Sequence, residues 1–308
     1  MCFNPGGGEV IILADQAERL RALARTKEDC LLQKVNTAGF PRVIAVVSGK
    51  GGVGKTNLVV NLALSLGQLG EETIVLDADV GLANVDILMG LSAPASLADV
   101  LQGRMELKEV ILRAPSNVAV IPGGSALSEV FSLDNQQKEQ LLARLTALGE
   151  KKDALLLVDC PAGISRNLLA LLGLAGEVIL VTTPEPTALA DAYSMLKLMQ
   201  RRRLFPKIYL VVNLVSSSGE GERVFMRLRE TCRSFLNIEP AFLGSIGYDY
   251  AVRKAVLKRT PFLIHFPQCG AAQDIQRMAR RLIGAGAVLS FSGEMEENLL
   301  KRLLALWS

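Results

Sequence analysis

The residues of this chain best suited to chemistry lie together at positions 49–56, which read GKGGVGKT. They fit the pattern G-x-x-x-x-G-K-[ST], in which glycines let successive backbone N–H groups point at an anion. In such a loop the Lys55 ammonium reaches nucleotide phosphates and the Thr56 hydroxyl is a ligand for Mg²⁺. The pattern therefore predicts a nucleotide site rather than a glycine-rich turn with a chance lysine. The expected nucleotide-binding residues are Gly49, Lys50, Gly51, Gly52, Val53, Gly54, Lys55, Thr56 and Asn57.

The elements that must position this loop lie on either side of it. Val43–Val47 is a run of β-branched and small apolar residues, typical of a strand that is buried on both faces. Leu58–Leu69 is apolar and periodic, which predicts a helix. The N-terminus of that helix would add partial positive charge beside the loop, where an anion would bind.

A second lysine, Lys50, lies inside the loop, where the general pattern does not require one. With it, the sequence KGGVGKT closely resembles the loop of the MinD/ParA-type ATPases. The resemblance implies that the cofactors are ATP and Mg²⁺, and that Lys50 crosses the interface of an ATP-dependent homodimer to contact the partner's nucleotide. An ammonium supplied there can neutralise charge that develops on phosphoryl transfer. The alternative is a solvated loop lysine.

Two acidic residues follow the next apolar strand, Thr73–Leu76. Asp77 and Asp79 stand at its C-terminal end, where ligands bind in parallel sheets. Residues 77–86, DADVGLANVD, resemble the first switch of MinD. That resemblance implies that Asp79 positions the attacking water and that Asp77 supports the magnesium shell; the alternative is an aspartate-rich turn. The predicted catalytic residues are Lys50, Lys55 and Asp79.

A further apolar strand, Ala154–Val158, closes on Asp159. An apolar run that ends in aspartate is typical of the second nucleotide motif, whose carboxylate holds a magnesium-bound water. Residues 159–163 resemble the second switch, in which Pro161 is followed by Gly163, a glycine that lets a backbone N–H approach the γ-phosphate. The predicted metal-site residues are Thr56, Asp77 and Asp159.

Strands and helices alternate from Arg42 onward. The pattern predicts an α/β fold with a doubly wound, mostly parallel sheet of seven or eight strands. The family resemblance implies that this fold is of the P-loop NTPase type (SIMIBI class). By the family resemblance, Asn213 reads the adenine edge, since an amide donates and accepts at once. Further strands are expected at Val118–Ile121, Glu177–Thr182, Lys207–Leu214 and Phe242–Ile246, and helices at Asn135–Leu148, Thr187–Met199, Gly219–Phe235, Tyr248–Lys258 and Ala271–Ile283.

The N-terminal part carries a short motif of its own. Residues 15–21 read DQAERLR, which resembles the DQAxxLR element of the flagellar FlhG/FleN branch of the MinD family. The resemblance implies stimulation of a signal-recognition-type GTPase, FlhF. The alternative is a capped helix docked on its own domain. The residues that would contact the partner GTPase are Asp15, Gln16, Ala17, Leu20 and Arg21.

The C-terminal part predicts a membrane contact. Glycines and serines from residue 284 to 293 mark a flexible joint, and residues 295–307 then read MEENLLKRLLALW. The apolar positions recur at helical spacing and form one wide face, and a terminal tryptophan suits a membrane interface. The alternative is a helix packed on the core. The predicted membrane residues are Leu299, Leu300, Leu303, Leu304, Leu306 and Trp307.

Composition narrows the remaining classes of function. The five cysteines include no C-x-x-C pair, which argues against a zinc or iron–sulfur site and against a metallocluster carrier. The net charge of +3 gives no indication of a DNA partner. Residues 201–203, three arginines at a predicted helix end, could bind acidic lipid or nucleic acid, although a solvated helix end is the preferred interpretation. No apolar run is long enough to span a bilayer.

The sequence thus predicts three parts: residues 1–41 for partner activation, 42–283 as the ATPase domain, and 284–308 for membrane targeting. The predicted function is an ATP-dependent dimeric switch that controls flagellar number or placement, cytoplasmic and peripheral at the inner face of the cell membrane. C-ring proteins or a flagellar transcription regulator are further candidate partners, and the membrane partner is an anionic surface. The alternatives are a ParA-like DNA-partitioning ATPase and an interaction module with an inactive nucleotide site.

Overall fold

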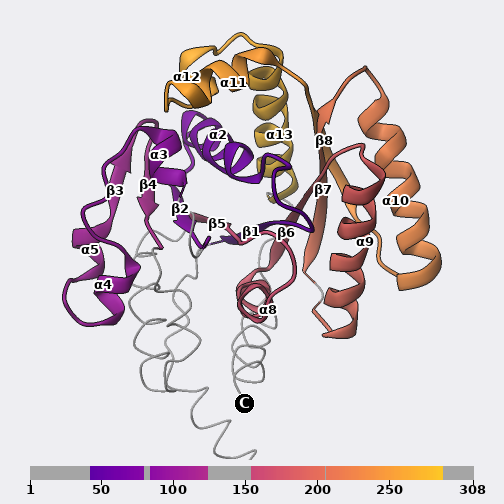
Figure 1. Cartoon of the computed structure of the whole chain (residues 1–308), viewed down its shortest axis with the longest axis horizontal. Coiled ribbons are helices and arrows are strands. Elements are labelled where there is room, and N and C mark those ends of the chain that lie inside the picture. Colours follow the sequence, from indigo (N-terminus) through magenta and orange to yellow (C-terminus); the bar gives the residue numbers. More distant parts are fainter. Residues whose placement is uncertain (1–41, 80–83, 124–153, 205, 287–308) are drawn as a thin grey trace, which may run out of the picture.

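Eight strands form one sheet at the centre of the molecule. The computed structural model describes residues 42–79, 84–123, 154–204 and 206–286 (Figure 1). The strand order is β3-β4-β2-β5-β1-β6-β7-β8, and all neighbours are parallel except β3 and β4. The strands are β1 (Arg42–Ser48), β2 (Thr73–Asp77), β3 (Leu112–Ala114), β4 (Val118–Ile121), β5 (Leu155–Asp159), β6 (Glu177–Thr182), β7 (Lys207–Val215) and β8 (Ala241–Gly247).

Helices cover both faces of this sheet, which confirms the predicted doubly wound α/β class. One hydrophobic cluster joins a face of the sheet to α2 (Lys55–Gln68), α3 (Val85–Met89), α11 (Tyr250–Leu257), α12 (Phe262–His265) and α13 (Gly270–Gly286). The other cluster joins the opposite face to α4 (Leu97–Leu101), α5 (Leu107–Val110), α8 (Arg166–Leu174), α9 (Pro186–Arg201) and α10 (Glu220–Leu236).

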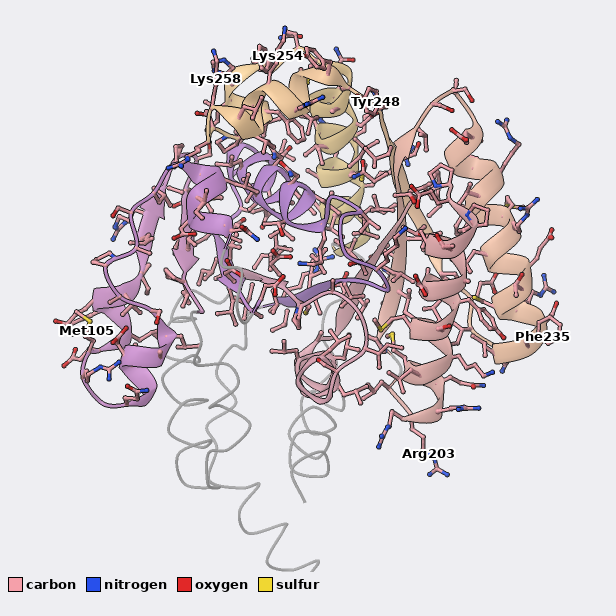
Figure 2. The ribbon with its side chains drawn as sticks, in the orientation of Figure 1. Met105, Arg203, Phe235, Tyr248, Lys254 and Lys258 are labelled. Carbon is pink, nitrogen blue, oxygen red and sulfur yellow. The ribbon has the colours of Figure 1, made fainter. Side chains whose placement is uncertain are left out.

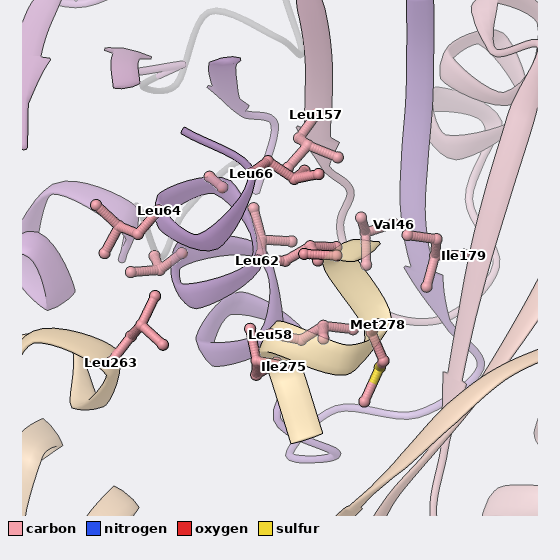
Figure 3. Packing of buried hydrophobic residues seen from close by; sticks show 14 of the residues in the cluster. Val46, Leu58, Leu62, Leu64, Leu66, Leu157, Ile179, Leu263, Ile275 and Met278 are labelled. Carbon is pink, nitrogen blue, oxygen red and sulfur yellow. The ribbon is translucent and has the colours of Figure 1, made fainter. Parts of the chain in front are cut away.

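The central strand β1 shows why both faces must be apolar. Ile44 and Val46 point into the cluster with α2, whereas Ala45 and Val47 point into the cluster with α9, and all four are fully buried. Alternation of side chains along a strand serves both layers at once, which requires a continuous apolar run. Figure 3 shows Val46 facing Leu58, Leu62 and Met278, so that α2 and α13 pack together over β1.

The structure adds elements that the sequence pattern did not predict. β3 pairs with β4 as an antiparallel hairpin whose turn holds Ser116 and Asn117 at positive φ, 59° and 56°. Turns of this kind match the twist of the flanking strands. The short helices α3, α4 and α5 are also additions, because four or five residues give too little periodicity to detect. The nine-residue α8 is an addition too; after Arg166 and Asn167 it has no polar residue that would show a period.

Some expected elements differ in extent or lie outside the described residues. α13 continues to Gly286, into the predicted joint at residue 284, and buries Leu282 near its end. The expected helix at 135–148 lies outside the described residues, as do both flanks, 1–41 and 287–308. Within the described part, no helix is both long and apolar enough to cross a bilayer.

One arginine organises the amino-terminal edge of the sheet, where β1, β6 and β7 begin. The Arg42 guanidinium donates to Glu177 through Nε–Oε1 at 2.5 Å and Nη2–Oε2 at 2.8 Å, and Nη2 also donates to the Leu282 carbonyl at 3.2 Å. Glu177 in turn lies in register with Lys207. The first residues of β1, β6 and β7 and the last turn of α13 therefore lie at one edge. We call this the amino edge, and the opposite one, where the strands end, the carboxyl edge.

Burial of α2 predicts where stability is most sensitive. Leu62 is fully buried among β1, β5 and α13, so Leu62→Ala should lower the free energy of unfolding by about 3 kcal/mol through lost burial and a residual cavity. Leu69→Ala, at the 42 % exposed end of the same helix, should cost less than about 1 kcal/mol. Denaturant unfolding of the two variants measures the difference; equal losses would contradict this packing.

Candidate nucleotide-binding site

The glycine-rich loop runs from the end of β1 into α2 at the carboxyl edge, as predicted. Gly54 is the residue before the helix and has φ 86°, a conformation that L side chains rarely adopt. Neighbours also pack against the loop: a Cβ at Gly49 would lie 2.5 Å from the backbone carbonyl carbon of Asp191 in α9, and one at Gly54 would overlap the side chain of Asn213. The loop is therefore held between α9 and the end of β7, with no room for larger residues at these two positions.

Asn213 supports the loop from β7. Its Nδ2 donates to the Val53 carbonyl at 2.8 Å, and its Oδ1 accepts from the Leu214 N–H at 2.9 Å. The side chain is buried, and Leu214 beside it has φ 58°. These bonds occupy one amide donor and one acceptor site, so the predicted contact to adenine would use the other N–H and the other lone pair. The adenine role stays a prediction, while the contact to the loop is a feature that sequence reasoning missed.

A buried ion pair joins the loop to the end of β5. The Lys55 ammonium contacts Asp159 Oδ1, and the two side chains are 7 % and 1 % exposed. The Thr56 hydroxyl also interacts with the Asp159 carboxylate. Burial raises the pKa of Asp159, and the charge of Lys55 acts against that rise. The pair brings together three residues that the sequence predicted to share one site.

Asp77 and Asp79, at the end of β2, complete an acidic cluster with Asp159. Asp77 lies in register with Asp159, and burial together with the charge of Asp159 raises the pKa of Asp77 to about 6. Its oxygens accept backbone N–H groups from Asp79 at 3.1 Å and from Asn84 and Val85 at 3.0 and 3.1 Å. Asp77 therefore anchors both ends of the first switch, whose residues 80–83 lie outside the described residues.

The chemistry of these donors fits a divalent cation. Asp159 Oδ2 is buried and has no hydrogen-bond partner, although buried carboxylate oxygens are normally satisfied. Hard cations such as Mg²⁺ prefer carboxylate and hydroxyl oxygens, and the Thr56 hydroxyl lies on the same side of the loop. A bound Mg²⁺ would supply positive charge between the phosphates and this cluster. Asp159 and Thr56 would hold it, with Asp77 orienting the surrounding loop.

Lys50 lies on the exposed side of the loop. Its Nζ donates to Glu185 Oε2 at 2.9 Å and lies 3.5 Å from the Thr187 hydroxyl at the start of α9. The carboxylate of Glu185 raises the pKa of Lys50, so the side chain is a cation near neutral pH. Glu185 and Thr187 are functional candidates that sequence reasoning missed, since only their place just after β6 pointed to the carboxyl edge.

The second switch lies beside the loop. The Gly163 N–H donates to the Ser48 carbonyl at 3.0 Å, and Gly163 has φ 77°. The predicted approach of this N–H to a γ-phosphate would require that bond to break, so the role of Gly163 and Pro161 stays a prediction. Cys160, between them and Asp159, is fully buried, and burial raises the pKa of its thiol. It is a packing residue.

The predicted partner and membrane residues cannot be placed. Asp15, Gln16, Ala17, Leu20 and Arg21, and the apolar positions from Leu299 to Trp307, lie outside the described residues.

Comparisons with known proteins agree with this site. Residues 39–283 match the ParA family, described as NUBPL iron-transfer P-loop NTPases. The chain belongs to this family of P-loop NTPases. Among the described residues, no three histidine, cysteine, aspartate or glutamate side chains are grouped so that they could hold a metal ion by themselves.

Individual relatives narrow the class. The antiactivator FleN of Pseudomonas aeruginosa is 39 % identical over 78 % of this chain and 86 % of its own length. The flagellum site-determining protein YlxH of Helicobacter pylori is 31 % identical over 94 % of this chain and 98 % of its own. The chain is thus a ParA-family ATPase of the FlhG type, which confirms the resemblance drawn from the loop and the N-terminal motif.

Solved structures agree on the fold. MinD in the MinC:MinD cell division complex of Aquifex aeolicus superposes with a TM-score of 0.64 at 25 % identity, over 79 % of this chain and 96 % of that chain. MinD of Pyrococcus horikoshii, complexed with Mg-ADP, gives the same TM-score and identity over 82 % of this chain and 100 % of its own.

The contact of Asn213 with the loop gives a testable expectation. Asn213→Ala should weaken ATP binding about fivefold, because one net hydrogen bond that shapes the loop is lost. If Asn213 only supports the loop, GTP and tripolyphosphate should weaken by the same factor; a loss confined to ATP would point to the adenine contact instead. Titration calorimetry with the three ligands, compared with the exposed Asn237→Ala, measures this.

Proposed function

We propose that this protein is an ATP-dependent dimeric switch of the FlhG type, which regulates flagellar number or placement. The observation that carries the proposal is the different placement of the two loop lysines: Lys55 is buried against Asp159, whereas Lys50 is 42 % exposed in a surface pair with Glu185. One loop therefore holds a lysine for its own nucleotide and a second lysine that a partner's nucleotide can reach.

The residues of the chain would share the hydrolytic work as follows. Lys55 and the loop N–H groups bind the phosphates, while Thr56 and Asp159 hold Mg²⁺. Asp79 is half-buried, and its charge raises the pKa of Asp159, so it lies near the carboxylate that would hold Mg²⁺. From there it can orient a water in line with the γ-phosphate. Lys50 of one protomer would neutralise charge that develops on the partner's phosphate.

Dimer formation would exchange one partner of Lys50 for another. In the single chain its ammonium bonds Glu185, an exposed pair of small net stability. A triphosphate carries more negative charge than a carboxylate or a diphosphate, so transfer of Lys50 is most favourable to ATP. ATP, but not ADP, would thus select the dimer, and hydrolysis would release it.

The N-terminal and C-terminal parts of the chain would make membrane binding and partner activation depend on whether the protein is a dimer. Two copies of the tail in one dimer bind a membrane more tightly than one, because the second contact is intramolecular. The N-terminal motif would stimulate an FlhF-type GTPase. We expect this stimulation of GTP hydrolysis to be weaker with the Gln16→Ala and Arg21→Ala variants. Flagellar C-ring proteins or a transcription regulator remain candidate partners.

Variants of Lys50 and Asp79 should distinguish dimer assembly from ATP hydrolysis. Asp79→Ala should remain a dimer with ATP but release phosphate roughly 100-fold more slowly, because the water is no longer oriented. Lys50→Ala should lose both ATP-dependent dimerisation and hydrolysis. Size-exclusion chromatography with light scattering, with ATP and with ADP, measures assembly, and phosphate release measures hydrolysis.

Lys258→Ala serves as the reference variant, since Lys258 is exposed just after α11 and its ammonium lies 3.0 Å from His265 Nε2, away from the loop. It should behave like the unaltered protein in both assays. An Asp79→Ala protein that stays monomeric with ATP would refute the switch.

Deletion of residues 295–308 tests the membrane part. The shortened protein should keep ATP-dependent dimerisation and should no longer sediment with vesicles. Sedimentation that is unchanged by the deletion would assign membrane binding to another part of the chain. Salt-sensitive retention of the ATP-bound dimer on DNA would instead favour the DNA-partitioning alternative.

A further inference from the structure

A basic cluster at the end of α9 is the charged surface that the nucleotide chemistry does not use. From residue 192 to residue 219 the chain contains five basic residues and no acidic one. Arg201, Arg202 and Arg203 are exposed at the end of α9, with Lys197 one turn before them and Lys207 just after. A positive charge suits a helix C-terminus, but one cation is sufficient for that role.

The end of α10 adds to this cluster. Gln200 Nε2 donates to the Leu236 carbonyl at 2.9 Å, which ties the ends of the two helices together. Arg233 is exposed in the last turn of α10, and Phe235 is 74 % exposed although it is a large apolar residue. Figure 2 shows Arg203 and Phe235 at the same end of the molecule. We call Arg201, Arg202, Arg203, Arg233 and Phe235 the arginine patch.

Carboxylates near the patch only partly offset its charge. Glu239 follows α10 and is bound by Arg229, and Glu230 lies one turn before Arg233. The patch therefore keeps an excess of positive charge and includes an exposed phenyl ring.

The patch lies at the amino edge, opposite the nucleotide. Lys207 begins β7 directly after α9 and is in register with Glu177, which Arg42 binds. Arg42 also binds the Leu282 carbonyl in the last turns of α13. The chain thus passes from α13 into residues 287–308 at the edge that carries the patch, while the loop lysines lie at the other edge.

The tail itself does not supply positive charge. Residues 287–308 contain two basic and three acidic residues. Their apolar face can insert into a bilayer, but they offer no net attraction to an anionic one. Attraction to an anionic surface would therefore need cations from another part of the chain.

We propose that the arginine patch is a second membrane contact, which binds anionic lipid headgroups beside the inserted tail. The proposal rests on the proposed membrane association of the tail. Arginines pair with phosphate oxygens bidentately, and a phenyl ring among them can enter the headgroup region. The exposed phenylalanine and the shared edge with an apolar tail favour lipid over nucleic acid as the occupant.

The test compares two variants with equal loss of charge. Arg201→Gln/Arg202→Gln/Arg203→Gln removes three cations at the amino edge. Arg253→Gln/Lys254→Gln/Lys258→Gln removes three exposed cations from α11 and the residue that follows it, and α11 comes after the end of β8 at the carboxyl edge. Both are made in the full chain with a non-hydrolysable ATP analogue, and circular dichroism and ATP-dependent dimerisation report that each is folded. Sedimentation uses phosphatidylcholine vesicles with and without about 30 % phosphatidylglycerol.

The amino-edge variant should lose at least tenfold in affinity for anionic vesicles, since each cation near such a surface contributes about fivefold. It should bind pure phosphatidylcholine as the unaltered protein does, and the α11 variant should keep anionic binding. About 0.5 M salt should abolish the difference between the two variants. Phe235→Ser should lose several-fold in affinity, and that loss should persist in salt.

Several results would overturn the proposal. One is anionic binding unchanged by the amino-edge variant; another is an equal loss in both triple variants, which would indicate only general charge. A loss of salt-sensitive DNA retention with unchanged vesicle binding would assign the patch to nucleic acid. If the unaltered protein binds no vesicles, the proposed tail contact fails as well. If it binds through the tail and the amino-edge variant matches it, only the patch proposal fails.

Discussion

The buried ion pair between Lys55 and Asp159 is the contact on which the rest of the site depends. It joins the loop after β1 to the end of the neighbouring strand β5, and both side chains are almost fully removed from water. Buried charges are tolerated only when they are paired and their remaining polar atoms are satisfied. Here one oxygen of Asp159 is left over, and a second carboxylate, Asp77, stands opposite on β2. The arrangement is electrostatically incomplete in a way that a metal-bound triphosphate would complete.

The two edges of the sheet carry different groups of functional candidates. Its carboxyl edge carries the loop, the acidic cluster and the exposed Lys50. Its amino edge carries Arg42, the last turns of α13 and the arginine patch, and the described chain begins and ends there. Communication between the edges has to pass along strands and helices that span the sheet. α9 does so, since its first turn offers Thr187 to Lys50 and its end carries the arginines.

The sequence predicted the sheet well because parallel strands buried on both faces leave long apolar runs, as in β1 and β6. The loop, Asp77, Asp79 and Asp159 were also placed correctly, because each lies at or just after the end of an apolar run that the sequence predicts to be a strand. What escaped prediction depends on tertiary contacts. Asn213 meets Val53 across 160 positions, and Glu185 meets Lys50 across 135. Short elements such as α4 and α5 carry no detectable period, and the antiparallel hairpin at β3 had only its turn residues as a signal.

The ion pair between Arg42 and Glu177 makes the first residue of β1 necessary for its charge as well as for the length of the strand. Glu177 is only 7 % exposed at the start of β6, and Arg42 is the cation that makes its burial tolerable. A truncated protein that begins at residue 43 would preserve almost all of β1 yet leave a carboxylate stranded in the interior. Arg42, the first residue of β1, is thus needed to keep the buried Glu177 paired.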